Sequence, residues 1–562
     1  MKTLLKQIII LALVASASSH AQKALPQAAR TESSVVHQKA FCAGQRLDAS
    51  ARAQAATVSS SLVSDTLAAH IQRIMERPEF RHALFGIEFY SLDTGQPIYT
   101  LNADKLFTPG STTKLLTEGT ALELLGADFR FRTRIYRTGT IAPDGTLDGD
   151  LVLVASGDPN LSGRIRPDGT LAFENEDHSY DGDPNTRAVP GDPLLVIRQL
   201  AQQIAAHVKK IRGHVLVDTS LFPEGDRELG TGVVISPVVV NDNLIDLTIG
   251  PGASEGATAL VRQSPTTSYA NFINQVTTGK SDSKPAIRFA SDVTKPDGAH
   301  TVTVAGSFPA GKQAILYKYA VPEPTRFAET VLREALRERG VSVEMSGPDA
   351  KPDFKALSYS YVSDHLIAEH VSPPLKEEIK VTLKVSQNLH ASSTPLILSA
   401  VLAPNDKTKT GFDLEREFLA RAGLDLTGAQ QGDGAGGNAH FTPDFMVSFL
   451  AYMARQKNYQ DFLKALPILG RDGTLFDIQP ASPAAGHVFA KTGTYGVGDP
   501  LNRRLLVTGK GLAGYMTTVG GQHLAFAIYV NNVSVPLEPD AIKQITGQAL
   551  GEIAAAAYET AR

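Results

Sequence analysis

The stretch from Ser111 to Lys114 places a hydroxyl and an amine three positions apart. It follows a Pro-Gly pair and opens an apolar run with helical spacing, so we expect both side chains on one face of a helix. A serine becomes a good nucleophile when a nearby base removes its proton. A lysine can be that base once burial beside another cation lowers its pKa, usually about 10.4, by about three units. The plain alternative for Ser111 is a helix cap, and a second Ser-x-x-Lys, at Ser281, lies in a polar loop.

A strand-like apolar run leads directly into Lys491, Thr492, Gly493 and Thr494. Because strand side chains alternate, Lys491 is expected on one face and the two threonines on the other. A glycine within a strand lets a ligand approach the backbone closely. The other Lys-Thr-Gly of the chain, at Lys409, leads into a charged helical stretch instead. The run at Lys491 therefore indicates a ligand-binding strand.

A third polar motif, Ser386-Gln387-Asn388, directly follows a helical pattern over 375–385, where a turn is expected. Each of the three motifs is weak alone. In the order Ser-x-x-Lys, Ser-x-Asn and Lys-Thr-Gly they resemble the set shared by penicillin-binding proteins and serine β-lactamases. The stretch 112–385 between the first two motifs is longer than a serine β-lactamase accommodates there.

From about residue 65 to its end, the sequence resembles the class C low-molecular-mass penicillin-binding proteins, the D-alanyl-D-alanine carboxypeptidase/endopeptidase family. The further segments that carry this resemblance are Gly157-Asp158-Pro159, Asp218-Thr219-Ser220-Leu221-Phe222, Gly250-Pro251-Gly252, Ser372-Pro373-Pro374-Leu375 and Gly470-Arg471-Asp472-Gly473-Thr474-Leu475. The resemblance implies a serine-type D-Ala-D-Ala carboxypeptidase, with DD-endopeptidase activity as a possible addition. Its substrates would be peptidoglycan stem peptides, and β-lactams would inhibit it.

The resemblance also assigns catalytic roles. Ser111 would be the acylated nucleophile, Lys114 its general base, and Ser386 the relay that passes a proton to the leaving amine. The backbone N–H groups of Ser111 and Thr494 would form the oxyanion hole.

Substrate-binding roles follow from the same resemblance. Asn388 would orient the substrate amide, and Lys491 with Thr492 would bind the terminal carboxylate. Gly493 and Thr494 would complete the strand against which the substrate lies.

Two segments depart from the family pattern. Asp433-Gly434-Ala435-Gly436 stands where the family has Asp-Gly-Ser-Gly. After Thr494 the chain inserts Tyr495 to about Lys510 before the next expected strand, beside the expected cleft. Asp218 is either a residue that faces the cleft or a structural aspartate in a turn.

Other potential sites are weaker. Gly252 to Gly256 fits Gly-x-Ser-x-Gly, but no helical pattern follows it, so a hydrolase elbow is not expected. The 14 histidines are scattered, and His370 and His487 are interpreted as structural. We expect no metal and no cofactor.

Two other function classes stay open. The same residues could serve a β-lactam or D-peptide hydrolase, and a non-catalytic wall-binding protein could retain the fold. Three intact motifs argue against the second alternative.

The elements that must position these motifs indicate an α/β (α+β) penicillin-binding/β-lactamase-like transpeptidase domain, an antiparallel sheet flanked by helices. Helical patterns surround the motifs, whereas short β-like runs fill the middle of the chain. We therefore predict a nested β-rich insertion of one or two subdomains. The predicted division is a signal peptide at 1–21, a flexible leader at 22–60, domain halves at 61–137 and 366–562, and an insertion at 138–365 with an inner subdomain at about 244–315.

Composition excludes several classes of protein. Of 562 residues, 42% are hydrophobic and the net charge is only −4, so neither a disordered chain nor a basic nucleic-acid-binding face is indicated. The single cysteine, Cys42, excludes an intramolecular disulfide. The basic and then apolar start at 1–21 is too short to span a bilayer and is typical of an export signal. We expect an exported protein, in the periplasm, without a transmembrane segment after signal removal.

Overall fold

The computed structural model describes residues 66–345, 352–538 and 540–561. The predicted signal peptide at 1–21, the leader at 22–60 and Cys42 lie outside the described residues. Within the described ranges, none of the helices combines the length and apolar character that crossing a bilayer requires.

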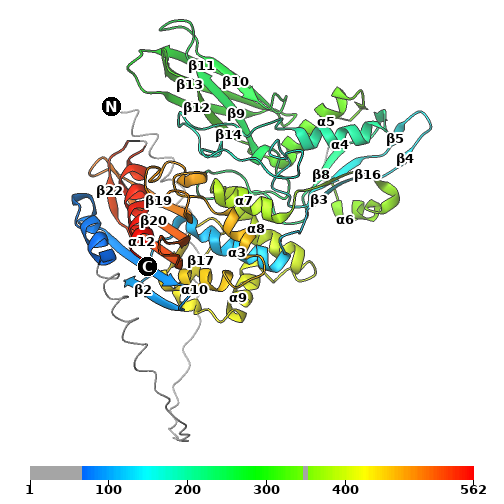
Figure 1. The fold of residues 1–562 in the computed structure, drawn as a ribbon. Coiled ribbons are helices and arrows are strands. Elements are labelled where there is room, and N and C mark those ends of the chain that lie inside the picture. Colours follow the sequence, from blue (N-terminus) through cyan, green and yellow to red (C-terminus); the bar gives the residue numbers. More distant parts are fainter. Residues whose placement is uncertain (1–65, 346–351, 539, 562) are drawn as a thin grey trace, which may run out of the picture.

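The main sheet joins strands from both ends of the chain, as the lower part of Figure 1 shows. Its strand order is β19-β20-β21-β1-β2, and β22 pairs with β20. All of these pairs are antiparallel. The bounds are β1 (Leu84–Ser91), β2 (Gln96–Leu101), β19 (Val488–Asp499), β20 (Arg504–Thr517), β21 (His523–Asn531) and β22 (Val533–Val535). This sheet, flanked by helices, confirms the predicted fold class.

Two cores form on the two faces of this sheet because strand side chains alternate. Phe526 and Ile528 of β21 pack toward α12 (Gln548–Thr560) and the helix at 66–75. Ala527 and Tyr529 point the other way, into the core that contains α3 and α10.

The second core holds the helices that carry the first two motifs. α3 is buried over its first ten residues, and these include polar side chains, such as Lys114 and Glu118, as well as the leucines. The helices of this layer are α3 (Thr113–Leu125), α7 (Leu375–Lys384), α8 (Asn388–Leu402), α9 (Gly411–Arg421), α10 (Pro443–Met453) and α11 (Tyr459–Ala465). A small ribbon of β17 (Ala429–Gln431) and β18 (Ala439–Phe441) lies beside them.

The chain between α3 and α7 forms a separate β-rich unit, seen at the upper right of Figure 1. One sheet has the order β16-β3-β6-β8 and another the order β15-β7-β5-β4. Their bounds are β3 (Arg132–Arg137), β4 (Thr140–Ile141), β5 (Thr146–Asp148), β6 (Leu151–Val154), β7 (Lys210–Ile211), β8 (Val215–Asp218), β15 (Ser342–Val343) and β16 (Leu366–Val371). We had predicted the boundaries at about 137 and 366. Because β3 pairs with both β6 and β16, strand pairing places these two boundary strands in the inserted unit.

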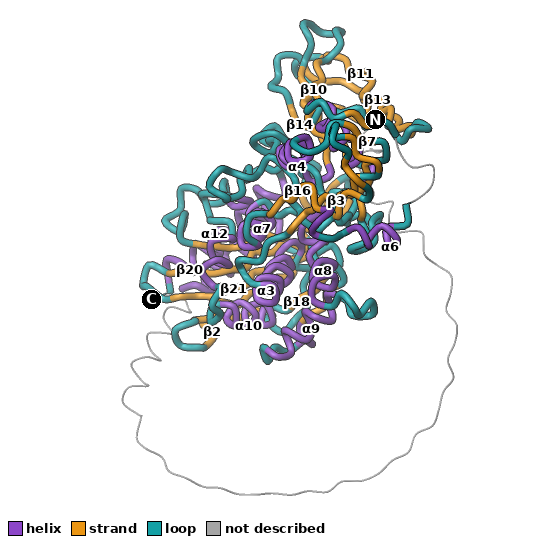
Figure 2. Tube along the Cα trace, turned by 90° about the vertical axis from the view of Figure 1, so that its right-hand side faces the viewer, coloured by secondary structure: helices purple, strands orange, loops and turns teal. Residues whose placement is uncertain are grey.

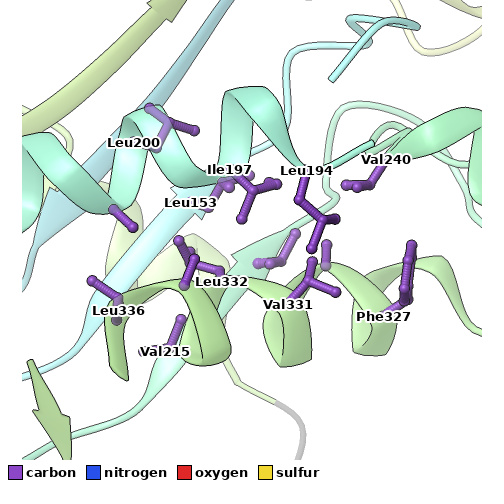
Figure 3. Close-up of a cluster of buried hydrophobic side chains, with 14 of the residues drawn as sticks. Leu153, Leu194, Ile197, Leu200, Val215, Val240, Phe327, Val331, Leu332 and Leu336 are labelled. Atoms are coloured by element: carbon purple, nitrogen blue, oxygen red, sulfur yellow. The ribbon is translucent and has the colours of Figure 1, made fainter. Parts of the chain in front are cut away.

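Two amphipathic helices cover the sheet of the inserted unit. α4 (Leu195–Ala205) and α5 (Pro324–Glu338) present their apolar faces to each other and to the strands. Figure 3 shows Ile197 and Leu200 of α4 facing Val331 and Leu332 of α5. This core is distinct from the two cores of the main sheet, so the unit has the apolar interior of a domain.

The far end of the inserted unit consists of two small sheets, at the top of Figure 2. Their orders are β10-β9-β14 and β11-β13-β12, around a core of their own. The bounds are β9 (Leu244–Gly250), β10 (Leu260–Ser264), β11 (Ala270–Gly279), β12 (Ala286–Thr294), β13 (His300–Pro309) and β14 (Ile315–Ala320).

The stretch from Tyr495 to Lys510 corrects one interpretation. We had read it as an insertion that precedes the next strand. Instead, β19 continues to Asp499 and β20 begins at Arg504, so the stretch lengthens one hairpin of the main sheet. The extended pairing places Lys510 directly opposite Thr494.

Candidate active site

Ser111 and Lys114 lie in adjoining turns at the start of α3. Ser111 occupies a short 3-10 turn, Gly110–Thr112, and α3 begins at the next residue. The Lys114 Nζ lies 2.8 Å from the Ser111 Oγ. The lysine is fully buried and the serine is only partly buried, so the serine hydroxyl stays accessible while the amine is desolvated.

Three further atoms surround the Lys114 amine. They are the Asn388 Oδ1 at 2.6 Å, the Ala435 carbonyl oxygen at 3.3 Å and the Ser386 Oγ at 3.4 Å. The first two are acceptors only, so they can take both N–H groups of a neutral amine. The nitrogen lone pair is then left for a hydroxyl proton.

Burial lowers the pKa of Lys114 from 10.5 to about 7, although the charges of Glu228, Asp433 and Glu118 oppose this change. About half of the molecules would then hold a neutral amine at pH 7. A base with a pKa near the working pH combines availability with proton affinity. Burial therefore gives Lys114 a pKa at which the amine can exchange protons near neutral pH.

Ser386 sits in a strained turn between α7 and α8. Its φ of 63° is unusual for a residue that is not glycine. The Tyr180 hydroxyl donates a hydrogen bond of 2.5 Å to the Ser386 carbonyl oxygen and lies 3.2 Å from the Asn388 Oδ1. Such a conformation persists only when its surroundings hold it in place. Tyr180 belongs to the inserted unit, so this unit helps to shape the turn.

Lys491 contacts Ser386 from the other side. Its Nζ donates to the Ser386 Oγ at 2.8 Å and to the carbonyl oxygen of Thr492 at 2.9 Å. The side chain is fully buried, and burial, with Lys114 and Lys510 nearby, holds its pKa well below the usual range. In this structure the Lys491 amine therefore contacts the Ser386 hydroxyl and the backbone of its own strand.

The backbone of β19 passes very close to the nucleophile. A Cβ on Gly493 would lie 1.9 Å from the Pro109 carbonyl oxygen and 3.0 Å from the Ser111 nitrogen, so no side chain fits there. Gly110, with a φ of 53°, leaves equally little room against the Thr494 nitrogen. The Ser111 and Thr494 nitrogens are thereby brought together, as an oxyanion hole requires.

The two threonines of β19 have different partners. The Thr492 hydroxyl donates to the Thr474 Oγ1 at 2.8 Å. The Thr494 Oγ1 accepts a hydrogen bond of 2.7 Å from the Lys510 Nζ. Neither Thr474 nor Lys510 was singled out as a site residue from the sequence, and only strand pairing reveals Lys510.

The segment Asp433-Gly434-Ala435-Gly436, which differs from the family pattern at Ala435, keeps its contacts with the site. The Asp433 carboxylate accepts the N–H groups of Ala435, Gly436 and Gly437 and so fixes the loop. Ala435 reaches Lys114 through its backbone carbonyl, and its side chain does not take part.

The inserted unit approaches Asn388 through a second loop, in addition to its contact through Tyr180. A loop held by Glu228 brings Gly230 so near that a Cβ there would lie 2.0 Å from the Asn388 Nδ2. The Glu228 carboxylate accepts the N–H groups of Gly230 and Thr231. Sequence reasoning missed this contact because the loop carries no motif.

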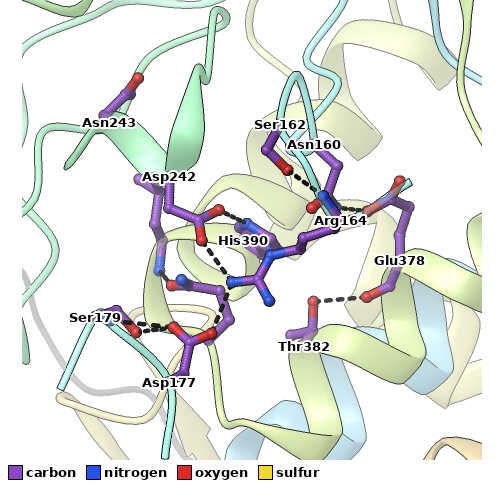
Figure 4. Close-up of polar contacts among 12 residues, drawn as sticks. Asn160, Ser162, Arg164, Asp177, Ser179, Asp242, Asn243, Glu378, Thr382 and His390 are labelled. Carbon is purple, nitrogen blue, oxygen red and sulfur yellow. Dashed lines mark hydrogen bonds and ion pairs between the residues drawn. The ribbon is translucent and has the colours of Figure 1, made fainter. Parts of the chain in front are cut away.

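A buried charge cluster anchors the inserted unit to α8 (Figure 4). The Arg164 guanidinium donates to Asp177 at 2.7 Å and to Asp242 at 2.6 Å, and all three side chains are almost fully buried. Asp242 also accepts a hydrogen bond of 2.8 Å from the His390 Nε2. His390 lies two residues after Asn388, so this contact connects the insertion to the Ser-x-Asn helix.

His178 completes the cluster between Asp242 and Asp246, at 2.8 and 2.9 Å. Burial alone would lower its pKa, but the carboxylates of Asp246 and Asp177 raise it to about 10, so the ring is charged. Asp177, His178 and Asp242 have the spacing of a metal site. Because Arg164 and the charged His178 already supply the cations, these residues form an ion-pair cluster.

The remaining sequence candidates lie apart from these motifs. The Asp218 Oδ2 accepts a hydrogen bond of 2.8 Å from the Tyr361 hydroxyl, and its Oδ1 caps the turn at Ser220. His370 lies 3.6 Å from Asp158, and His487 stacks on the Tyr558 ring. These contacts are those of structural residues.

The chain was compared with known proteins. Residues 67–550 match the sequence profile of the D-Ala-D-Ala carboxypeptidase 3 (S13) family. The chain is 27% identical over 509 residues to the D-alanyl-D-alanine carboxypeptidase of Actinomadura sp. (strain R39), covering 86% of this chain and 84% of the relative. It is 26% identical over 463 residues to D-alanyl-D-alanine carboxypeptidase DacB of Haemophilus influenzae, covering 79% and 84%.

A solved structure gives the same result for the fold. The crystal structure of penicillin binding protein 4 (dacB) from Haemophilus influenzae superposes with a TM-score of 0.64 at 21% identity, covering 87% of this chain and 99% of that one. Another structure of that protein is a complex with a β-lactam and superposes with a TM-score of 0.62.

Fold and family together define a peptidase of the penicillin-binding class. The chain belongs to the D-Ala-D-Ala carboxypeptidase 3 (S13) family, which confirms the resemblance found in the sequence.

Proposed function

We propose that this protein is a serine-type D-Ala-D-Ala carboxypeptidase that removes the terminal D-Ala of peptidoglycan stem peptides through an acyl-enzyme on Ser111. The observation that carries the proposal is the buried Lys114 amine, which lies 2.8 Å from the Ser111 Oγ and within 3.4 Å of the Ser386 Oγ. One base thus reaches both the nucleophile and the residue that would protonate the leaving group.

Acylation begins when neutral Lys114 takes the Ser111 hydroxyl proton. The Ser111 Oγ then forms a bond to the carbonyl carbon of the penultimate D-Ala, and the carbonyl oxygen becomes an oxyanion. The N–H groups of Ser111 and Thr494 stabilise that charge where it develops.

Departure of the terminal D-Ala needs a proton on its nitrogen. Ser386 gives its hydroxyl proton to this nitrogen and receives one from protonated Lys114, so the C–N bond breaks and the amine departs neutral. Lys491, which donates to the Ser386 Oγ, holds that hydroxyl in place. Deacylation reverses these roles: Lys114 takes a proton from water, the resulting hydroxide attacks the acyl carbon, and Ser111 leaves with a proton.

Substrate contacts follow from the surrounding groups. Asn388 orients the substrate amide, and Thr492, Gly493 and Thr494 form the edge along which the terminal residue lies. Endopeptidase activity uses the same steps, with a cross-linked peptide amine as the leaving group. β-Lactams acylate Ser111 because their strained amide occupies the position of the scissile bond.

Export also belongs to this proposal. Peptidoglycan lies outside the cytoplasmic membrane, and the signal-like residues 1–21 support delivery to the periplasm. No cofactor and no nucleic-acid partner enter the proposed reaction.

Labelling with a fluorescent penicillin, followed by mass mapping of the acylated peptide, tests the nucleophile. Wild type and Ser281→Ala should label alike, and Ser111→Ala should fold but take up no label. Label on any other serine would overturn the assignment.

Two alternatives use the same fold: a hydrolase of β-lactams or other D-peptides, and a non-catalytic wall-binding protein. Steady release of D-Ala from a D-Ala-D-Ala peptide excludes the second. Faster turnover of β-lactams than of this peptide would favour the first.

A further inference from the structure

A short segment of the inserted unit, residues 175–180, reaches the main domain at two places beside the motifs. The Tyr180 hydroxyl donates a hydrogen bond of 2.5 Å to the carbonyl oxygen of Ser386. Five residues earlier, the Asn175 Oδ1 accepts a hydrogen bond of 2.7 Å from the backbone N–H of Gly473. We call this segment the strap, because it runs from the Ser-x-Asn turn to the turn at Gly473.

The strap lies at the end of the site where the Ser-x-Asn turn and the Lys-Thr-Gly strand meet. The Lys491 Nζ donates to the Ser386 Oγ at 2.8 Å, which joins the two motifs there. Gly473 is followed by Thr474, whose Oγ1 accepts a hydrogen bond of 2.8 Å from the Thr492 hydroxyl. In the proposed reaction the terminal residue of the substrate lies along this strand, so the strap stands at the leaving-group end.

An ion pair fastens this end of the strap to the main domain. The Glu176 carboxylate lies 3.4 Å from the Lys543 Nζ, and each side chain is only about a quarter exposed. Partial burial strengthens such a pair relative to one in open solvent. Lys543 also pairs with Asp477 at 2.7 Å, so it keeps a counter-ion when Glu176 is replaced. The Glu176 charge can therefore be removed without leaving a partly buried cation unpaired.

The middle of the strap is fixed inside the inserted unit. Asp177 accepts a hydrogen bond of 2.7 Å from Arg164, and both side chains are almost fully buried (Figure 4). This anchor does not involve the main domain. The contacts of Asn175 and Glu176 are therefore the ones that hold the first residues of the strap against the main domain.

We propose that Asn175 and Glu176 hold the strap closed at the leaving-group end of the site, and that this closure makes the enzyme prefer a single D-Ala over a cross-linked peptide as leaving group. This inference rests on the proposed function, because it names which of two leaving groups the site selects. A departing D-Ala is one residue. The amine of a cross-link belongs to a second stem peptide, and that whole peptide must fit past the strap. Opening the strap breaks a hydrogen bond and an ion pair, and this cost falls on the larger leaving group.

The competing explanation is that these contacts only stabilise the inserted unit. Their loss would then lower the free energy of unfolding and change both activities by the same factor. The ratio of the two kcat/KM values separates the explanations, because a purely structural loss cancels in that ratio.

The test compares two substrates and two variants. Wild type, Glu176→Gln and Glu338→Gln are assayed on a stem peptide that ends in D-Ala-D-Ala, and on a cross-linked dimer in which the cross-link is the one bond of this kind. Glu176→Gln should raise kcat/KM for the dimer by about 2- to 12-fold, the effect of losing one such contact. It should change D-Ala release by less than about twofold.

Glu338→Gln is the matched control, because it removes an ion pair of 3.2 Å with Arg198 elsewhere in the inserted unit. It should leave the ratio of the two activities unchanged. An unchanged ratio in Glu176→Gln, or an equal loss on both substrates, would overturn the proposal.

Hydrogen exchange gives a second readout, one that needs no turnover. The Gly473 amide donates to Asn175, so its exchange should be faster in Glu176→Gln and unchanged in Glu338→Gln. Exchange of this amide at the wild-type rate in Glu176→Gln would show that the ion pair does not hold the strap, and the proposal would fail.

Failure of the proposed function gives a different pattern. If wild type releases no D-Ala but cleaves the dimer, and Glu176→Gln speeds that cleavage, the role of the strap stands and the carboxypeptidase assignment fails. If wild type releases D-Ala and Glu176→Gln leaves the ratio unchanged, the function stands and the role of the strap fails.

Discussion

The rate of Ser111 acylation should depend on pH through Lys114. Burial lowers the pKa of this lysine from 10.5 to about 7, which corresponds to about 5 kcal/mol. At pH 7 the neutral fraction rises from about one molecule in 3,000 to about one half. If neutral Lys114 is the base, this placement alone makes the reactive form about 1,500 times more abundant.

The assay is the second-order rate constant for acylation by a fluorescent penicillin between pH 5.5 and 9.5. Its logarithm should rise by one per pH unit and level off near pH 7, because deprotonation of Lys114 creates the active form.

Glu118→Gln supplies the matched control for the rising limb. Glu118 is buried one helical turn from Lys114, and its carboxylate hydrogen-bonds to Thr394. Burial raises the pKa of Glu118 itself to about 7, so its carboxylate is charged only in the upper part of the rising limb. There its negative charge raises the pKa of Lys114, so its removal should shift that part of the limb to lower pH. A rate that is flat between pH 5.5 and 7.5, or a shift to higher pH in Glu118→Gln, would refute Lys114 as the base.

Three further predictions concern the surroundings of the site. Lys114→Met should lower acylation by about 10²- to 10⁴-fold and raise the melting temperature. Between about pH 7 and 10.5, Lys114 is protonated in the unfolded chain but mostly neutral in the folded protein. The free energy of unfolding of the wild type should therefore rise with pH in this range, and the rise should be weaker in Lys114→Met. Arg164→Met should lower the free energy of unfolding in urea by about 3–5 kcal/mol, because it removes the buried guanidinium that pairs with both Asp177 and Asp242 and leaves His178 as the cation between them; an unchanged midpoint would contradict this. Tyr180→Phe should lower kcat about 2- to 12-fold through the lost hydrogen bond to Ser386, with circular dichroism to verify the fold.

The motif residues could be predicted from the sequence because each signal is local. The helical spacing after Ser111 and the strand alternation around Lys491 are properties of a few consecutive residues. The three motifs do meet, because Lys114 contacts Asn388 and Lys491 contacts Ser386, although 112–385 separates the first two motifs in sequence. The family resemblance implied that the motifs come together, because the spacing of residues along the chain does not show which distant segments are in contact.

The residues that sequence reasoning did not identify contact the motifs from segments that lie far away in the sequence or on another strand. Lys510 reaches Thr494 only because β19 extends past the motif and folds back into β20, and we had interpreted that stretch as a separate insertion. Tyr180 has no recognisable context within the chain, since its partner Ser386 lies in another unit. The two strands at the ends of the insertion also come together through long-range pairing, because β3 pairs with β16 across the whole inserted length.

The inserted unit therefore belongs to the machinery of the site. Ser386 needs a left-handed backbone conformation that its own sequence does not favour, and such a conformation must be held from outside. Tyr180 binds its carbonyl oxygen, the Glu228 loop packs on Asn388, and Asp242 binds His390 one half-turn further along α8. All three contacts come from the insertion and converge on one turn of the chain. An insertion that only bound the cell wall would need none of them, so these contacts couple the inserted unit to the turn that carries Ser386 and Asn388.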